Sequence, residues 1–376
     1  MRSRKIWTWV AVVSVLSLVT AACGSGSANS GSPATSTTVS ANPAAQAGLA
    51  EATRLVAEWT KFPTSVGYNK PVGKVIPTGK KLAFMNCGLP ACIALGKAAD
   101  DAAKVLGWTV QQVNFQPTPE AVSAAWAQVA RTKPDGVIAT GFPRVLFEES
   151  LQKLKAANIP VAECCVPDPV ANGIIAQISE ANTELYGQQF AAWLTVATKG
   201  DGQILWVNNQ DYPVIPLMFD FMKKNVAQLC PNCKVESIDV PATEFGTTAP
   251  DKIVSYLRAH PNVNYVALGY DGMANGLPAA MAAAGIKVPF IGQDADPPNK
   301  QYILDGTQAA SIGFPLHESM WAAVDAIARH IVGVDVSVVQ SPMPVLIYTK
   351  ATIKDATVAE PFVADYQEQF KSMWGK

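Results

Sequence analysis

The stretch "KLAFMNCGLPACIALGKAADDAAKVLGWTV", residues 81–110, passes from one type of secondary structure to another and back. Residues 81–86 are mostly apolar, which is typical of a strand that is covered on both faces. Residues 94–107 place apolar side chains at the spacing of an amphipathic helix, and "WTV" begins a second strand-like run. Because a helix links the two runs, the stretch predicts a βαβ unit with parallel strands.

The same alternation continues along the rest of the chain. Amphipathic stretches such as 119–132 and 317–333 separate further strand-like runs, which are "GVIATG" (136–141), "IPVAEC" (159–164), "IIAQIS" (174–179), "QILWVN" (203–208), "KVESIDV" (234–240), "YVALG" (265–269), "PFIGQD" (289–294), "AASIG" (309–313) and "VLIYT" (345–349). Beyond about 250–300 residues, a chain usually divides into domains, and the body from residue 80 onward reaches that length. The sequence therefore predicts an α/β fold of two Rossmann-like lobes with parallel sheets. In such sheets, ligands bind beyond the carboxyl ends of the strands.

The first 23 residues have the layout of a secretory signal. Arg2, Arg4 and Lys5 precede an apolar run, and small residues precede Cys23. The apolar run is shorter than the roughly 20 residues of a membrane span. "VTAAC" is similar to a lipobox, although Thr20 departs from the usual leucine. We expect residues 1–22 to be a lipoprotein signal peptide and Cys23 to be acylated, which would anchor an extracytoplasmic protein to the cell membrane. An ordinary signal peptide or an N-terminal anchor helix is the alternative.

The residues after Cys23 predict a tether. Residues 24–47 are nearly all small or polar and uncharged, so they bury too little apolar surface to fold. Residues 49–62 have the periodicity of a helix that either packs on the main body or extends the tether. We therefore expect residues 23–79 to form a lipid-anchored flexible tether with a short helix, and the folded body to begin near Lys80.

The composition excludes several classes of partner and reaction. The chain is 49% hydrophobic and 16% charged, with a formal net charge of −1, so nothing indicates a nucleic-acid partner. It has three histidines and no glycine-rich phosphate loop, HExxH or GxSxG motif in its body. We expect no catalytic residue, no metal and no cofactor.

Several segments together carry a resemblance to a known family. Residues 81–110, "LKAANIPVAEC" (154–164), "RAHPNVNYVALGYDGMANGLPAAMAAAG" (258–285) and "VPFIGQDADPPNKQYILDGTQAASIGF" (288–314) resemble type I periplasmic binding proteins of the ribose and sugar-binding branch, in the same order. The resemblance implies a monomeric receptor that traps a small molecule in a cleft and delivers it to an ABC permease with its ATPase. It also implies two lobes joined by three hinge crossovers. The N-terminal lobe would hold 80–178 and 314–342, and the C-terminal lobe 179–313 and 343–376.

Several positions that contact sugar in this family differ here. Leu89, Ala91 and Cys92 stand in the first loop, where sugar binders carry an asparagine and two aromatic residues. Cys165 and Val166 replace the Asp-Arg pair that clamps sugar hydroxyls after the fourth strand. Pyranose recognition needs such charged, bidentate groups, because each unpaired buried polar group is costly. The resemblance therefore implies a ligand that is less polar than a hexose.

The other carried-over positions support the same interpretation. An apolar residue near Leu217 replaces an arginine, Tyr270 replaces an asparagine, and Phe314 replaces a hinge glutamine, whereas the aromatic Phe245 and the carboxylate of Asp294 are retained. Asp294 and Tyr270 would orient the ligand, with help from residues beyond the "QILWVN" strand, namely Asn209, Gln210 or Asp211. Trp206 and Tyr212 are further candidates for ligand contacts. A sugar bound through neighbouring groups, or a receptor that signals to a membrane kinase, remains an alternative.

Six cysteines besides Cys23 predict three disulfides in an oxidising compartment. Cys230 and Cys233 stand between a helix and a strand, where a disulfide would staple the corner; redox chemistry or half a zinc site is the alternative. The remaining four stand beside the expected cleft and allow two arrangements. Either Cys87 pairs with Cys92 and Cys164 with its neighbour Cys165, or the two loops are cross-linked. Adjacent Cα atoms lie ~3.8 Å apart, below the ~4.4 Å usual for disulfides, so a vicinal bond would be strained.

Overall fold

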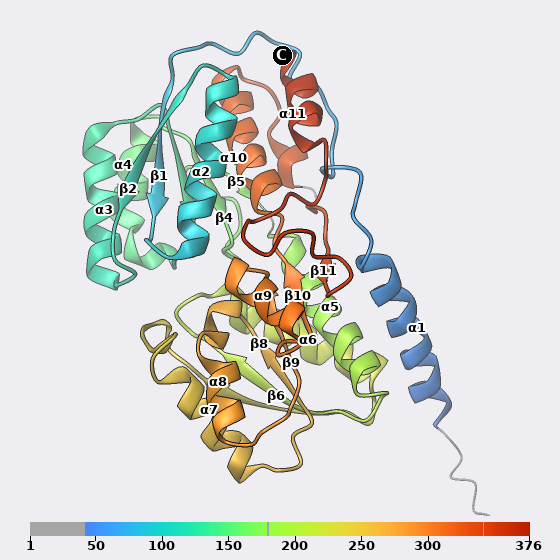
Figure 1. The fold of residues 1–376 in the computed structure, drawn as a ribbon. Helices are drawn as coiled ribbons and strands as arrows, with labels where there is room; N and C mark the ends of the chain where they lie inside the picture. Colours follow the sequence, from blue (N-terminus) through green and yellow to red (C-terminus); the bar gives the residue numbers. More distant parts are fainter. Residues whose placement is uncertain (1–41, 179, 341) are drawn as a thin grey trace, which may run out of the picture. The chain divides into compact units, whose positions relative to one another are not determined.

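The structure is a computed structural model that describes residues 42–178, 180–340 and 342–376 (Figure 1). The described residues belong to one compact unit. The expected signal peptide, the lipidation site Cys23 and most of the expected tether lie outside the described residues. In the described part of the chain, no helix has the length and apolar character needed to span a bilayer.

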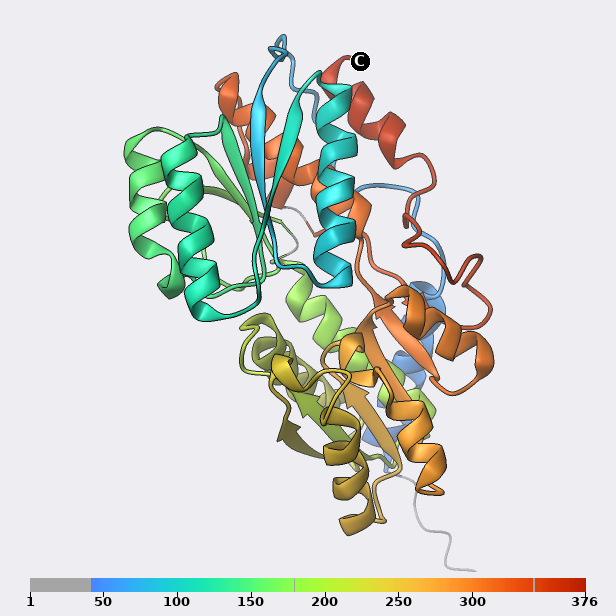
Figure 2. The same cartoon turned by 60° about the vertical axis from the view of Figure 1, so that its left-hand side comes forward.

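The first sheet has five parallel strands in the order β2-β1-β3-β4-β5. Its elements are β1 (Lys81–Asn86), α2 (Pro90–Val105), β2 (Thr109–Asn114), α3 (Pro119–Thr132), β3 (Gly136–Thr140), η1 (Arg144–Leu146), α4 (Glu148–Ala156), β4 (Val161–Cys164) and β5 (Ile174–Ile178). Helices α3 and α4 cover one face, and α2 with the later helix α10 (Leu316–Ile331) covers the other (Figures 1 and 2). Successive side chains of a strand point to opposite sides of the sheet, so a strand whose consecutive residues are apolar gives both faces an apolar surface. In β3, Val137 packs among residues of α3 and α4, whereas Ile138 packs among those of α2 and α10.

The second sheet has six strands in the order β11-β10-β9-β8-β6-β7, all parallel except β11. Its elements are α5 (Asn182–Ala197), β6 (Gln203–Asn208), α6 (Val214–Leu229), β7 (Lys234–Asp239), η2 (Ala242–Glu244), α7 (Ala249–Ala259), β8 (Tyr265–Leu268), η3 (Asp271–Ala274), α8 (Leu277–Ala283), β9 (Phe290–Asp294), α9 (Pro297–Asp305), β10 (Ala310–Gly313) and β11 (Ile347–Tyr348). This architecture confirms the predicted α/β fold of two lobes built on parallel sheets.

Between β5 and β11, the chain passes from one lobe to the other at three places. These are between β5 and α5, between β10 and α10, and between η4 (Ser337–Gln340) and β11. Since η4 packs on β5 and α10, the return to β11 crosses to the second sheet. The three predicted crossovers are therefore present, and each connecting segment is short enough to act as a hinge.

The N-terminal segment corrects the expected tether. Helix α1 (Pro43–Trp59) packs on α5 and α6, and its Gly48 lies against the backbone of Leu229 so closely that a Cβ would clash. After it, Val66, Val72 and Ile76 are buried in the core that contains α2 and α10. Residues 43–79 are thus attached to both lobes, because the apolar face of the helix and these three side chains leave water on folding.

The C-terminal segment corrects the expected lobe boundary. Helix α11 (Tyr366–Trp374) packs on α10 of the first lobe, although residues 343–376 were assigned to the second. Trp374 stacks on Trp321 at 5.3 Å between ring centroids and donates a 2.7 Å hydrogen bond from Nε1 to Oδ1 of Asp325. Such aromatic contacts bury large apolar areas, which stabilises the packing of α11 on the first lobe. The end of the chain therefore does not continue the second lobe, as the sequence led us to expect.

Candidate functional site

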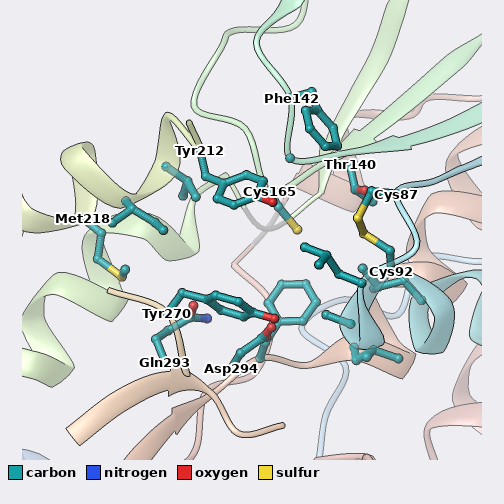
Figure 3. A pocket seen from close by; sticks show the side chains of 18 of the residues that line it. Cys87, Cys92, Thr140, Phe142, Cys165, Tyr212, Met218, Tyr270, Gln293 and Asp294 are labelled. Atoms are coloured by element: carbon teal, nitrogen blue, oxygen red, sulfur yellow. A yellow bond between two sulfur atoms is a disulfide. The ribbon is translucent and has the colours of Figure 1, made fainter. Parts of the chain in front are cut away.

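A cavity of about 130 Å³ lies where the carboxyl ends of strands from both sheets meet (Figure 3). Its walls come from both lobes and consist of Cys87, Leu89, Ala91, Cys92, Leu95, Thr140, Gly141, Phe142, Cys165, Thr183, Tyr186, Tyr212, Val214, Ile215, Met218, Tyr270, Gln293, Asp294, Phe314 and Leu316. The position agrees with the rule that ligands bind beyond the carboxyl ends of parallel strands. Most of these walls are apolar or aromatic, as in small-molecule sites.

Seven of the predicted ligand residues line this cavity, namely Leu89, Cys92, Cys165, Tyr212, Tyr270, Asp294 and Phe314. The Cys165 sulfur points into the cavity, and Tyr212, Tyr270 and Asp294 reach it from the second lobe (Figure 3). Tyr212 also contacts Phe142 of the first lobe at 5.9 Å between ring centroids. Aromatic side chains from the two lobes thus already meet beside the cavity.

Three of the predicted residues build a turn of the second lobe and do not line the cavity. The side-chain oxygen of Asn209 accepts hydrogen bonds from the amides of Asp211 and Tyr212, at 2.9 and 3.0 Å. Oδ2 of Asp211 accepts a 2.8 Å bond from the Ala242 amide, and the exposed Gln210 donates to Asp239. These polar groups are satisfied by the protein because asparagine and aspartate readily bond to nearby backbone. Of the three, Asn209 bonds to the backbone of Tyr212, which lines the cavity.

Val166 and Phe245, also predicted, lie beside the cavity and do not line it. Val166 is buried on the side of the first sheet that faces α3, next to Trp126 and Phe147. Phe245 packs against the ring of Tyr270 at 5.8 Å between centroids, so it supports a lining residue from behind. Trp206 is fully buried in the core of the second lobe.

The sequence-based prediction missed the residues after β3 and at the start of α5. Thr140 ends β3 and Gly141 and Phe142 follow it, so the rule about carboxyl ends of strands could have identified them. Thr183 and Tyr186 stand in the first two turns of α5, immediately after the first crossover. No strand precedes them directly, and only the fold brings them to the cavity.

The cysteines lie at bonding distance in one of the two arrangements that were left open. The structure pairs Cys87 with Cys92, Cys164 with Cys165, and Cys230 with Cys233. The first two pairs therefore place sulfur atoms of Cys87, Cys92 and Cys165 in the wall of the cavity. Cys165 has a φ of 67°, a left-handed conformation that is costly for a residue other than glycine.

No arginine, lysine or histidine of the described chain lines the cavity. The arginine that follows β3, Arg144, is paired elsewhere: its Nη2 lies 2.8 Å from Oε2 of the buried Glu163. Gln177 donates a 2.7 Å hydrogen bond to the same oxygen. Burial raises the pKa of Glu163, and the bonds from Arg144 oppose that rise. This ion pair belongs to the first-lobe fold and offers no donor to a ligand.

Asp294 is the one acidic residue among the described residues that line the cavity. Burial, followed by the negative charges of Asp296 and Asp271, raises its pKa well above the usual range for an aspartate. Asp271 is satisfied by Ser311 and Gln308, and Asp296 accepts a 3.0 Å hydrogen bond from the Tyr270 hydroxyl. In the described structure, no donor bonds to the Asp294 carboxylate.

Three hydroxyl groups in the cavity wall also lack a hydrogen-bond partner within the described chain. They belong to Thr140, Tyr186 and Tyr212. Thr140 and Tyr186 are only 8% and 4% exposed. Because a buried polar group without a partner costs free energy, such groups in a cavity wall are suited to bond with a ligand.

A second hollow of about 330 Å³ adjoins the cavity and shares Asp294, Phe314 and Leu316 with it. Unlike the cavity, it has charged walls, including Lys97, Asp296, Lys300 and Glu360. Lys300 lies 3.5 Å from Glu360 and donates a 2.9 Å bond to the carbonyl of Val358. Its charge is thus engaged by the C-terminal segment. The three shared residues separate a charged space from an apolar one.

Comparison with known proteins gives a family and a fold. The family model described as "Periplasmic binding protein domain" matches residues 83–335, which is more than half of the chain. No curated protein matches the sequence. GanP, a glucose-galactose binding protein from Geobacillus stearothermophilus, is 20% identical, with a TM-score of 0.67, over 74% of this chain and 100% of its own.

Two further solved structures are similar at the same level. An ABC transporter solute binding protein from Agrobacterium vitis with bound allitol is 18% identical, with a TM-score of 0.64, over 73% of this chain and 97% of its own. A periplasmic ribose ABC transporter protein from Conexibacter woesei is 17% identical, with a TM-score of 0.61, over 75% and 95%. At such identities, the likeness shows the fold and leaves the ligand to be argued from this cavity.

Proposed function

Because this chain belongs to the periplasmic binding protein family, which consists of solute-binding proteins without enzymatic activity, we propose that it is the solute receptor of an ABC transporter. It works outside the cytoplasm, anchored to the cell membrane by a lipid on Cys23. The receptor is a monomer that delivers its solute to a permease with its ATPase. The solute is a small molecule that is less polar than a hexose.

The chemistry of the cavity wall carries the proposal about the solute. Apolar, aromatic and sulfur-containing side chains make up most of the wall, and Asp294 is its one acidic residue among the described residues. A hexose presents several adjacent hydroxyls, each of which needs a partner when it is buried. Thr140, Tyr186 and Tyr212 offer a few hydroxyls, whereas the bidentate charged groups of sugar clamps are missing. Such a wall favours a solute with an apolar body and few polar groups.

Capture follows from the contribution of both lobes to one cavity. Only a closed arrangement lets Cys165 and Phe142 of the first lobe contact a solute together with Tyr212 and Tyr270 of the second. A solute that contacts both lobes therefore shifts the equilibrium towards the closed form. Rotation at the three crossovers would open the cavity and release the solute to the permease.

Titration with small neutral probes and with sugars tests the proposal. We expect cyclohexanol and 2-phenylethanol to raise the melting temperature and to bind in isothermal titration, since ligands that bind the folded state stabilise it. D-ribose, D-glucose and D-galactose should give no comparable binding. Micromolar binding of any of these sugars, about −8 kcal/mol, would contradict the apolar assignment.

A matched pair of variants ties the binding to this cavity. Ala91 lines the cavity at the start of α2, so Ala91→Trp should fill the space and abolish probe binding. Val75 is 92% exposed, so Val75→Trp adds the same ring without touching the cavity and should bind like the parent protein. Equal binding by both variants would place the solute elsewhere.

A further inference from the structure

The carboxylate of Asp294 is held at the cavity by its backbone. Asp294 and Ala295 both have positive φ values, 118° and 57°, in a region that residues other than glycine rarely adopt. The Ala295 amide donates hydrogen bonds to Oδ2 of Asp271 at 2.8 Å and to Oγ of Ser311 at 3.0 Å. These buried bonds maintain the strained conformation, which is typical of functional sites.

The protein supplies Asp294 with no counter-charge. Burial and then its acidic neighbours, Asp296 and Asp271, oppose a negative charge on Asp294. Lys300 is directed towards Val358 and Glu360, on the side of the second hollow. Without a positive partner, Asp294 is kept neutral in the solute-free protein by its raised pKa. A cationic solute would supply the positive charge that the ionised carboxylate lacks.

Aromatic rings surround the space into which Asp294 opens. Phe142 comes from the first lobe, Phe314 from a crossover, and Tyr186, Tyr212 and Tyr270 from the second lobe. Burial raises the pKa of the Tyr186 phenol, and the proximity of Asp294 raises it further. The faces of aromatic rings attract cations, most strongly where water is excluded.

We propose that the solute is an organic cation: a protonated amine on an apolar body, whose ammonium group pairs with Asp294 and whose body lies against the surrounding rings. The inference rests on the proposed function and names the class of solute at the same site. An ammonium group would give Asp294 its missing counter-charge and donate to the unpartnered Tyr186 hydroxyl. A neutral solute would satisfy the hydroxyls but leave the carboxylate without a positive partner.

Matched amines and alcohols test this inference with the whole chain. The pairs are cyclohexylamine with cyclohexanol, and 2-phenylethylamine with 2-phenylethanol, each measured by isothermal titration. We expect each amine to bind at least about tenfold more tightly than its alcohol, because charge-assisted hydrogen bonds are the stronger ones. Asp294→Asn should remove that preference, because the amide cannot carry the negative charge that pairs with the ammonium group. Asp251→Asn, which changes an exposed acid, should keep the preference.

The Asn variant should fold, since its amide is neutral at a position where burial and then the nearby Asp296 and Asp271 already oppose a negative charge, and its melting temperature checks this. Alcohols that bind as tightly as their amines would overturn the inference while leaving an apolar solute receptor intact. A preference for amines that persists in Asp294→Asn would also overturn it. If neither amine binds at concentrations up to about 10 mM, which is far above typical dissociation constants, the inference is contradicted as well. Binding of sugars alone would overturn both the inference and the proposed function.

Discussion

The amide of Ala295 donates a 2.8 Å hydrogen bond to Oδ2 of Asp271, a carboxylate that is fully buried behind the cavity. Ser311 reaches the same oxygen at 2.5 Å, and Gln308 bonds to Oδ1 at 2.9 Å. Burial raises the pKa of Asp271 to about 7 in spite of these donors. The network fixes the turn that carries Asp294, so residues without any contact to the solute determine where the carboxylate lies.

Ser311→Ala should destabilise the protein. The change removes one donor to the buried Asp271 and one acceptor for the Ala295 amide, so we expect the free energy of unfolding to fall by about 1–3 kcal/mol. Urea unfolding measures it. Thr247→Ala, which removes an exposed hydroxyl bonded to the carbonyl of Glu244, should cost less than about 0.5 kcal/mol. An equal cost for the two variants would show that the network does not stabilise the turn.

Stability should depend on pH through Glu318. Oε1 of this buried carboxyl accepts bonds from the amides of Phe362 and Val363, Oε2 has no partner within the described chain, and burial raises its pKa to about 7. The folded state therefore holds a proton that the unfolded state loses near pH 4–5, so this contribution is fully present below about pH 4 and is lost as pH rises towards 7. Thermal unfolding from pH 4 to 8 measures it.

Glu318→Gln is the matched variant for this pH dependence. Glutamine keeps the accepting oxygen and cannot ionise, so it resembles the protonated carboxyl. We expect the variant to be more stable than the parent at pH 8, by about 2–3 kcal/mol, and the difference to shrink as pH falls towards 4. A difference that stays constant across this range would contradict the assignment of the raised pKa to Glu318.

The C-terminal helix should be essential to the first lobe. Trp374→Ala removes a buried ring that stacks on Trp321, as well as the donor to Asp325, so we expect a loss of about 3–5 kcal/mol in unfolding free energy. Trp374→Phe keeps an aromatic ring and should lose less, about 1–3 kcal/mol. Similar stability of Trp374→Ala and the parent in urea unfolding would mean that α11 does not pack on α10.

Peptide mapping without reduction should recover three disulfides. We expect Cys87 linked to Cys92, Cys164 to Cys165, and Cys230 to Cys233. Peptides cross-linked between the loops of residues 87–92 and 164–165 would contradict this pairing. Replacing both Cys230 and Cys233 with serine should leave probe binding unchanged, because this pair lies away from the cavity.

The sequence predicted the sheets and lobes because buried parallel strands and amphipathic helices leave periodic patterns. It also indicated Asp294, Tyr270 and Cys165, which stand at the end of a strand or just after it. Asn209 and Asp211 were predicted as ligand contacts and do not line the cavity, because a polar side chain after a strand can bond to its own turn as well as to a ligand. Tyr186 could not be predicted, since its place in the cavity depends on how α5 begins after the first crossover. The attachment of α1 and α11 depends on packing between segments far apart in sequence, which periodicity does not encode.

Native mass spectrometry of the whole chain, after incubation with a cellular metabolite extract, tests the central claim most directly. The account predicts that the parent protein and Val75→Trp retain one small solute, less polar than a hexose and bearing a basic nitrogen, and that Ala91→Trp retains none. Retention of a hexose or pentose by the parent protein, or of the same solute by Ala91→Trp, would contradict it.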